Sequence, residues 1–171
     1  MLKTLEPHIK TLDLILQKQL QLNVALLDLL EQKRTALREA NTKQMNDVCE
    51  LEKEKVKFIK QLEGKRQQVV SNITRQINPA AKAPMTMHEI AKHIGGPIGD
   101  RLMLRRAQVR KKMTEVRDQA SITKRATESL MRHMQSIVRT VAAASTGTAS
   151  YGDRGVMNTQ GMTLSTVNMT A

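Results

Sequence analysis

The segment from residue 102 to residue 141, LMLRRAQVRKKMTEVRDQASITKRATESLMRHMQSIVRTV, decides the fold of this chain. It places an apolar side chain at alternating steps of four and three residues, and only Arg106, Thr123 and Thr127 depart from the pattern. We call these positions the C-terminal seam, whose apolar members are Leu102, Val109, Met113, Val116, Ala120, Leu130, Met134, Ile137 and Val141. A repeat that stays in register over about five heptads is typical of a helix that lies along another helix.

A second seam of the same kind, which we call the N-terminal seam, runs from Leu2 to Ala40. Most of its positions are apolar, and its polar positions are Gln19, Asn23 and Lys33. The register then shifts by one residue, close to Asn41 and Gln44, which together resemble a helix cap. Residues 41 to 46 are therefore either a turn between two helices or an overwound part of one long helix.

Proline and glycine divide the middle of the chain. The stretch NPAAKAP at 78–84 carries two prolines, which cannot continue a helix. Thr86 and Glu89 then form a Thr-x-x-Glu capping box, which predicts a short helix that the glycines at 95–99 terminate. We expect one helical unit over residues 1–144, with helices at about 2–40, 44–77, 86–94 and 100–143.

Composition favours narrow helix contacts over a thick globular core. The chain has one Phe, one Tyr and no Trp, so the core consists of Leu, Ile, Val, Met and Ala. Residues 145–171 are small and polar without an apolar period, which predicts a disordered tail. The predicted fold is all-α: an elongated antiparallel coiled-coil helical bundle with a disordered C-terminal tail.

The sequence offers no catalytic or metal-binding arrangement. His88, Glu89 and His93 resemble a zinc-protease helix, but the histidines are five positions apart, which turns them about 140° from each other around the helix. A phosphate-binding loop follows a strand, and no strand precedes the glycines at 95–99. The lone Cys49 has no base nearby in the sequence that would activate its thiol. We therefore expect no enzymatic activity, no cofactor and no metal.

The start of the chain argues for a cytoplasmic protein. Lys3, Glu6, Lys10 and Asp13 interrupt any apolar core of an export signal, and no stretch approaches the roughly 18 uncharged residues of a membrane span. A single cysteine, Cys49, cannot form an internal disulfide, which fits a reducing compartment.

Basic residues outnumber acidic ones, 28 against 16, which gives a formal net charge of +12. Six of them form what we call the basic stripe: Arg101, Arg105, Arg106, Arg110, Lys111 and Lys112. Such a density can neutralise several phosphates, although a solvated helix face beside a seam is the commoner explanation. The lack of aromatic stacking platforms disfavours binding of single-stranded nucleic acid.

Four stretches resemble the FlgN family of flagellar type III export chaperones. They are LLDLLEQKRTALREAN at 26–41, VCELEKEKVKFIKQLEGKRQQ at 48–68, MTMHEIAKHIGGPIGDRLMLRRAQVRKKM at 85–113 and the Tyr-Gly-x-x-Gly of 151–155. The resemblance covers about residues 2–155 and depends on the order of these parts along the chain.

The resemblance implies a cytoplasmic helical protein that escorts the junction proteins joining hook to filament, and contact with components of the export apparatus. Its third long helix would act as a surrogate partner for amphipathic helices that otherwise self-associate. The residues expected to bind this cargo are Leu130, Met131, Met134, Ile137, Val138 and Val141. Tyr151 is a further expected contact from the tail.

Other interpretations remain open at this stage. The half of the C-terminal seam up to Ala120 can instead pack permanently on residues 5–37 of the same chain. The alternative functions are a basic coiled coil that coats nucleic acid through the basic stripe and a structural dimerisation rod. The seams are compatible with both a monomer and a dimer.

Overall fold

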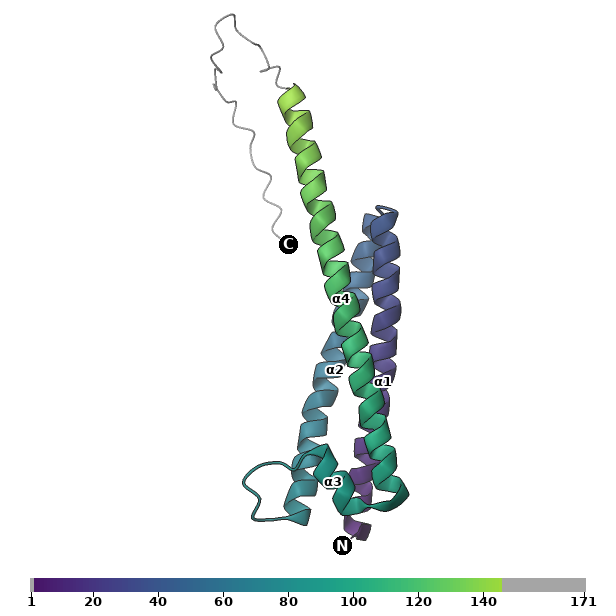
Figure 1. The fold of residues 1–171 in the computed structure, drawn as a ribbon, viewed down its shortest axis with the longest axis vertical. Helices are drawn as coiled ribbons and strands as arrows, with labels where there is room; N and C mark the ends of the chain where they lie inside the picture. The colour runs from purple at the N-terminus through teal and green to yellow at the C-terminus, as the bar shows by residue number, and fades with distance from the viewer. Residues whose placement is uncertain (1, 146–171) are drawn as a thin grey trace, which may run out of the picture. The chain divides into compact units, whose positions relative to one another are not determined.

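The computed structural model describes the backbone of residues 2–145 and the side chains of residues 5–143. Within that part of the chain all regular structure is helical, which confirms the all-α bundle (Figure 1). The helices are α1 (Leu2–Arg38), α2 (Thr42–Ile77), α3 (Met87–Ile94) and α4 (Gly96–Ser145). Ser145 is the last residue of α4, and the predicted tail beyond it, Tyr151 included, lies outside the described residues.

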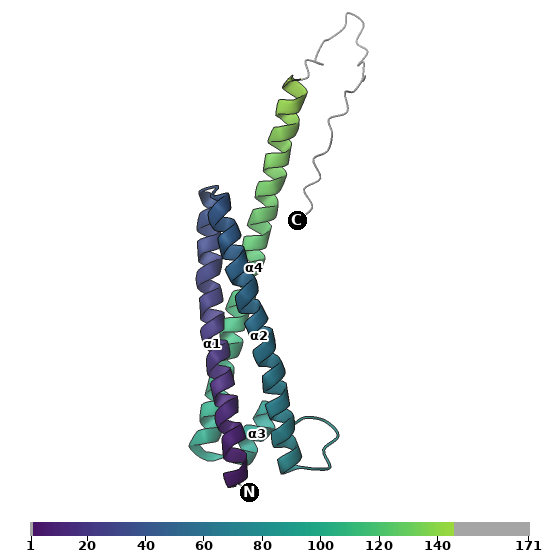
Figure 2. The ribbon, with the colours of Figure 1, turned by 180° about the vertical axis from the view of Figure 1, so that it is seen from behind.

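A three-residue turn joins α1 to α2, so residues 2–77 are not one overwound helix. Ala40 has a φ of 50°, and the Asn41 amide donates to the Ala36 carbonyl over 2.9 Å. This combination is a Schellman cap, which ends α1 two residues before the expected end at Ala40. Asn41 then caps α2, because its side chain accepts the Gln44 amide over 3.0 Å. The chain reverses here, and α2 runs back beside α1 in both views (Figures 1 and 2).

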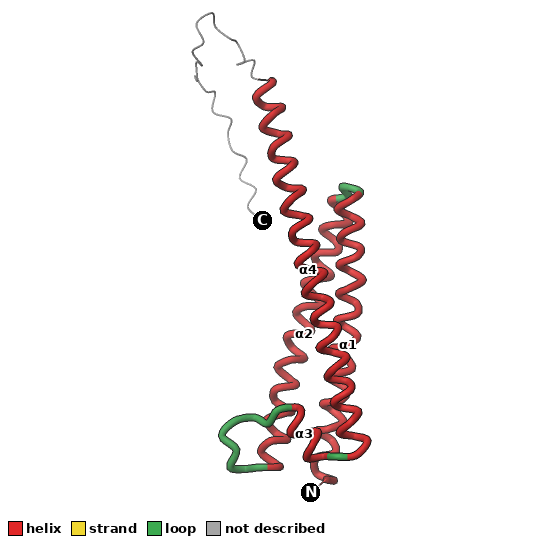
Figure 3. The backbone as a smooth tube through the Cα atoms, viewed as in Figure 1, coloured by secondary structure: helices red, strands yellow, loops and turns green. Residues whose placement is uncertain are grey.

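The short helix α3 has the capping box that its sequence predicts. The Thr86 amide donates to the Glu89 carboxylate over 2.6 Å, and the Glu89 amide donates to the Thr86 hydroxyl over 3.3 Å. The backbone hydrogen bond from Thr86 holds the pKa of Glu89 below its ordinary value. Figure 3 shows the long loop from α2 that leads into this cap.

A tight corner between α3 and α4 starts the last helix earlier than expected. Gly95 and Gly96 have φ of 65° and 56°, a conformation that side chains with a Cβ rarely adopt. Pro97 follows inside the first turn of α4, where its fixed φ suits a helix start. The glycines therefore do end α3, but α4 begins at Gly96 and not near residue 100.

Gly99 lets this corner close. A Cβ on Gly99 would lie 2.5 Å from the carbonyl oxygen of Ala91, which no real side chain tolerates. The backbone of α3 therefore packs directly on the first turn of α4. This contact fixes where α4 leaves the corner.

The chain divides into two compact units after Thr127, and the first unit contains the main core. Its buried apolar side chains come from all four helices: Leu5, Ile9, Leu12, Leu16, Val70, Ile73, Met87, Ile90, Leu102 and Val109. A smaller cluster contains Leu26, Leu29 and Val48, with Ile59 and Val116 packed against it. Three members of the first half of the C-terminal seam, Leu102, Val109 and Val116, thus pack against clusters of their own chain, whereas Met113 is 47% exposed.

Two polar positions of the N-terminal seam are buried between these clusters. Gln19 is 5% exposed and donates to the Glu63 carboxylate over 3.2 Å, while the Asn23 amide group donates to the Gln19 carbonyl over 2.7 Å. Arg66 donates to both oxygens of Glu63, over 2.8 and 2.6 Å. The hydrogen bond from Arg66 is the main cause that lowers the pKa of Glu63. The buried side chains of Gln19 and Asn23 therefore each have a hydrogen-bond partner, as a polar layer in a coiled coil requires.

Up to Thr127, α4 runs parallel to α1. Near the start of both helices, the Asp13 carboxylate lies 3.3 Å from Arg105 Nε and 3.8 Å from Arg101 Nε. Two turns or more further along both helices, a groove is lined from both sides. Its lining residues are Leu27, Leu30, Glu31, Arg34, Glu115, Asp118 and Gln119. Within the first unit, α1 and α4 therefore form a parallel helix pair.

Candidate functional site

The second unit contains the part of α4 from Glu128 to Ser145, taken here by itself. Its six apolar side chains of interest are all exposed: Leu130 37%, Met131 56%, Met134 57%, Ile137 49%, Val138 65% and Val141 60%. We call these six residues the α4 apolar face. Their spacing of three and four residues places them on one side of the helix.

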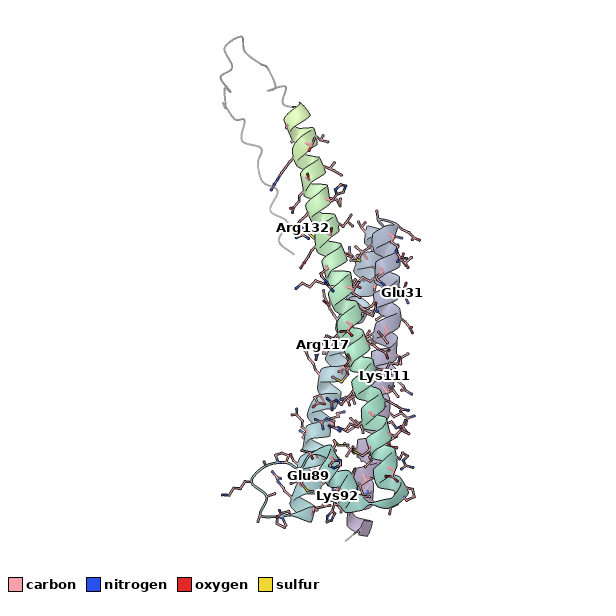
Figure 4. The ribbon with its side chains drawn as sticks, in the orientation of Figure 1. Glu31, Glu89, Lys92, Lys111, Arg117 and Arg132 are labelled. Carbon is pink, nitrogen blue, oxygen red and sulfur yellow. The ribbon has the colours of Figure 1, made fainter. Side chains whose placement is uncertain are left out.

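The opposite side of this helix is polar. Relative to Met134, the helical turn places Ser129, Arg132, Ser136 and Arg139 roughly on the other side. Figure 4 labels Arg132 on this stretch. The helix is thus amphipathic, with an apolar side that faces solvent.

Burial of the α4 apolar face by a partner would contribute favourable free energy to binding. Complete burial of a Val, Leu, Ile or Met side chain is worth about 1.5–3 kcal/mol, so covering a half-exposed one gains roughly 1 kcal/mol. Six such side chains give a gross gain on the order of 6 kcal/mol, from which the costs of association are subtracted. A partner helix with its own apolar side chains adds a comparable amount, which is the range of a reversible protein complex.

Two polar members of the C-terminal seam, Thr123 and Thr127, lie at the end of the first unit. Thr123 is only 2% exposed, although threonine is a polar residue and polar residues are uncommon in a core. Its hydroxyl donates to the Gln119 carbonyl over 2.9 Å, and the Thr127 hydroxyl donates to the Thr123 carbonyl over 2.9 Å. The helix backbone satisfies each hydroxyl, so Thr123 can be buried. In the sequence, only its position in the C-terminal seam indicated this burial.

The structure does not gather the basic stripe into one surface. Arg101 and Arg105 lie beside Asp13, and Lys112 pairs with Glu115 over 2.6 Å. Within residues 5–143, no ion pair engages Arg106, Arg110 or Lys111. At about 100° per residue, six positions within twelve residues also point to several sides of α4, where Figure 4 labels Lys111.

The remaining polar candidates serve local structure. Glu89 caps α3, and both histidines of that helix, His88 and His93, are exposed. No three His, Cys, Asp or Glu side chains lie close enough to hold a metal ion in the part of the chain that the structure describes.

Cys49 is half-buried beside an ion pair. Lys33 donates to the Glu52 carboxylate over 2.7 Å and also lies near the Cys49 thiol. Burial acts to lower the pKa of Lys33, but the hydrogen bond and charge of Glu52 outweigh it and leave this pKa raised. Lys33, the third polar position of the N-terminal seam, thus has a partner on α2.

The groove between α1 and α4 was not anticipated from the sequence, because no motif or period marks it. Two atoms within it, Arg34 Nε and Gln119 Oε1, are buried without a hydrogen-bond partner in the described structure. The other end of the guanidinium, Arg34 Nη2, bonds the Glu31 carboxylate.

A search for membrane-crossing helices among the described residues found none of sufficient length and apolarity. The family model described as FlgN protein matches residues 1–159. Comparison with curated proteins and with solved structures gave no significant match.

Proposed function

We propose, because this chain belongs to the FlgN family of flagellar export chaperones, that it binds hook–filament junction proteins through the α4 apolar face. The observation that carries the proposal is the exposure of six apolar side chains on one side of one helix. The family is one of chaperones and not of enzymes, and its process is type III export during flagellum assembly.

The mechanism is helix pairing. Junction proteins carry amphipathic helices that assemble with one another in the finished structure, so the same helices would self-associate before export. A cargo helix that lays its apolar side on the α4 apolar face is covered and unavailable for self-association. The chaperone acts in the cytoplasm and releases its cargo at the export apparatus.

Side-chain chemistry suits more than one cargo. Met131 and Met134 are unbranched and flexible, so they adapt to differently shaped apolar surfaces. Because no charged group belongs to the α4 apolar face, the pairing depends on apolar burial and changes little with salt concentration.

The test places two carboxylates on the apolar side of the helix. Met134→Asp with Ile137→Asp should abolish binding to a purified junction protein, because each carboxylate is either buried without a partner or keeps the cargo away. The loss of several kcal/mol turns roughly micromolar binding into none detectable. Isothermal titration calorimetry measures the binding, and circular dichroism measures helical content, which should be preserved.

A matched control puts the same charge on the other side of the helix. Ser129→Asp with Ser136→Asp adds two carboxylates to the same unit and should leave binding within about threefold. Retained binding by the Met134/Ile137 variant contradicts the proposal. Loss of helical content in that variant means instead that this surface is an internal core, which also contradicts it.

The basic stripe gives the test of the nucleic-acid alternative. Substitution of Arg105, Arg110 and Lys111 by Ala should change junction-protein binding only modestly. If the protein instead coats duplex DNA, the triple basic variant should lose binding and the Met134/Ile137 variant should keep it. The affinity should also fall steeply with salt concentration, since phosphate binding releases counterions. A dimerisation rod predicts that the Met134/Ile137 variant sediments as a monomer while the unaltered chain sediments as a dimer without cargo.

A further inference from the structure

We propose that Met131 and Met134 form an oxidation-sensitive site, at which a peroxide converts the thioethers to sulfoxides and switches off the α4 apolar face. This inference rests on the proposed function, because it concerns the regulation of the same surface. It is carried by the position and exposure of these two methionines relative to the others in the described chain.

Accessibility separates the methionines into groups. Met131 and Met134 are 56% and 57% exposed, whereas Met87 is 7% exposed in the main core. Met113, at 47%, is exposed as well but lies in the first unit. Oxidation of a thioether follows the access of the oxidant to sulfur, so Met131 and Met134 react early and Met87 late.

The chemistry needs only a peroxide. Hydrogen peroxide transfers one oxygen atom to the thioether sulfur, so an S–O bond forms, the O–O bond breaks and water leaves. Sulfur is oxidised by two electrons and the peroxide is reduced by two. Methionine sulfoxide reductases reverse the step, which makes the modification a switch and not only a lesion.

The expected effect falls on binding and not on folding. Met134 lies one turn from both Leu130 and Val138, so a sulfoxide there places a strong dipole in the middle of the apolar surface. Burying a polar group without a hydrogen-bond partner weakens binding by about tenfold for each sulfoxide. Neither methionine belongs to a core cluster of the described structure, so the helices remain folded.

The experiment treats the full chain with graded hydrogen peroxide and follows each methionine by peptide mass spectrometry. Binding of a purified junction protein is titrated before and after treatment. The unaltered chain should lose about a hundredfold in affinity once Met131 and Met134 are oxidised, with an unchanged circular dichroism spectrum. Met131→Leu with Met134→Leu has no thioether on this surface, so its affinity after the treatment should stay within about threefold of its own affinity before the treatment.

Met113→Leu is the matched control. It removes an exposed methionine outside the α4 apolar face, so the variant should lose affinity as the unaltered chain does. Equal loss in the Met131/Met134 variant overturns the inference, because other methionines are then responsible. Oxidation of Met87 before Met131 and Met134 overturns it too.

Failure of the inference and of the proposed function can be told apart. Full oxidation without any loss of binding overturns the inference alone, since the untreated protein has bound its cargo. No binding before treatment overturns both. Reduction of the oxidised chain by a methionine sulfoxide reductase should restore the affinity, and unrestored binding with a folded chain excludes a reversible switch.

Discussion

The half of α4 up to Thr127 and the half from Glu128 to Ser145 carry the same apolar repeat but expose it very differently. Leu102 and Val109 are 0% and 5% exposed, whereas Met134 and Val141 are 57% and 60% exposed. The first pair belongs to a core that includes side chains of α1, α2 and α3. The second pair belongs to no core cluster of the described structure.

This difference shows that a heptad repeat specifies a helix with an apolar side and leaves open what covers that side. In the first unit the chain itself covers Leu102 and Val109, so truncation of these side chains should cost folding stability. In the second unit the apolar side chains remain available, so their removal should cost binding. The same kind of substitution therefore has different consequences in the two halves of one helix.

The largest effect on stability is expected from matched leucine substitutions in the two halves. Leu102→Ala should destabilise the protein by about 3 kcal/mol, because it opens a cavity in a fully buried core. Leu130→Ala, at a side chain 37% exposed, should change stability by less than about 0.5 kcal/mol. Urea unfolding followed by circular dichroism measures both. Equal losses at the two sites would mean that the second half is covered after all.

A glycine pair tests what starts α4. Gly99→Ala should cost about 2 kcal/mol, because its Cβ would meet the Ala91 carbonyl oxygen at 2.5 Å. Gly64→Ala, inside α2 with nothing within 4 Å of the new Cβ, should instead stabilise by about 0.5–1 kcal/mol. Thermal unfolding of both variants measures whether each substitution lowers or raises the stability. A neutral Gly99→Ala would show that the corner between α3 and α4 relaxes easily.

Much of the fold was predictable because its signals are local. The Thr86–Glu89 cap, the break at 78–84 and the apolar periods depend on neighbouring residues, and the structure has all three. The α1–α2 turn was only one of two options, because a shift of register alone does not distinguish a Schellman cap at Ala40 from overwinding. The early start of α4 was missed, since glycines and a proline that end one helix also begin the next.

The candidate site was predictable in a different sense. Sequence identifies the residues of the α4 apolar face from their spacing, but spacing is the same in the buried half. Thr123 shows the limit from the other direction, because a polar residue type conceals a position that is 2% exposed. Gln19 and Asn23 are similar, since they are buried although polar: Gln19 donates to Glu63 on α2, and Asn23 donates to the Gln19 carbonyl within α1. Which positions are covered depends on contacts between distant segments, which periodicity does not contain.

A smaller effect is expected from the ion pair that joins α1 to α4. Asp13→Asn should destabilise the first unit by about 0.5–1 kcal/mol at low salt, because it discharges the partner of Arg101 and Arg105. Added salt should reduce this difference. The control is Glu6→Gln, which removes an exposed pair with Lys10 and should have no measurable effect. Cargo binding by the second unit should be unchanged in both variants.

The smallest expected effect is a pH dependence that belongs to the first unit. Arg66 holds the pKa of Glu63 below its ordinary value of 4.5, so the carboxylate contributes stability that is fully present above about that pH. This contribution is lost as the pH falls through the lowered pKa of the folded state. The Glu63 side chain is 40% exposed, so solvent screening limits the contribution to about 0.5 kcal/mol.

Glu63→Gln isolates this contribution from those of the other carboxylates. The variant should be less stable than the unaltered chain at pH 7, and the difference should shrink below pH 4.5, where the protonated carboxyl resembles the amide. Unfolding curves recorded from pH 7 to pH 3 measure how the free energy of unfolding changes with pH in the variant and in the unaltered chain. The α4 apolar face contains no titratable side chain, so variants within it, such as Leu130→Ala, should keep the pH slope of the unaltered chain. A flattened slope in Leu130→Ala and not in Glu63→Gln would place the acid-sensitive contact in the second half of α4. It would contradict the division between a half that stabilises the fold and a half that we propose binds cargo.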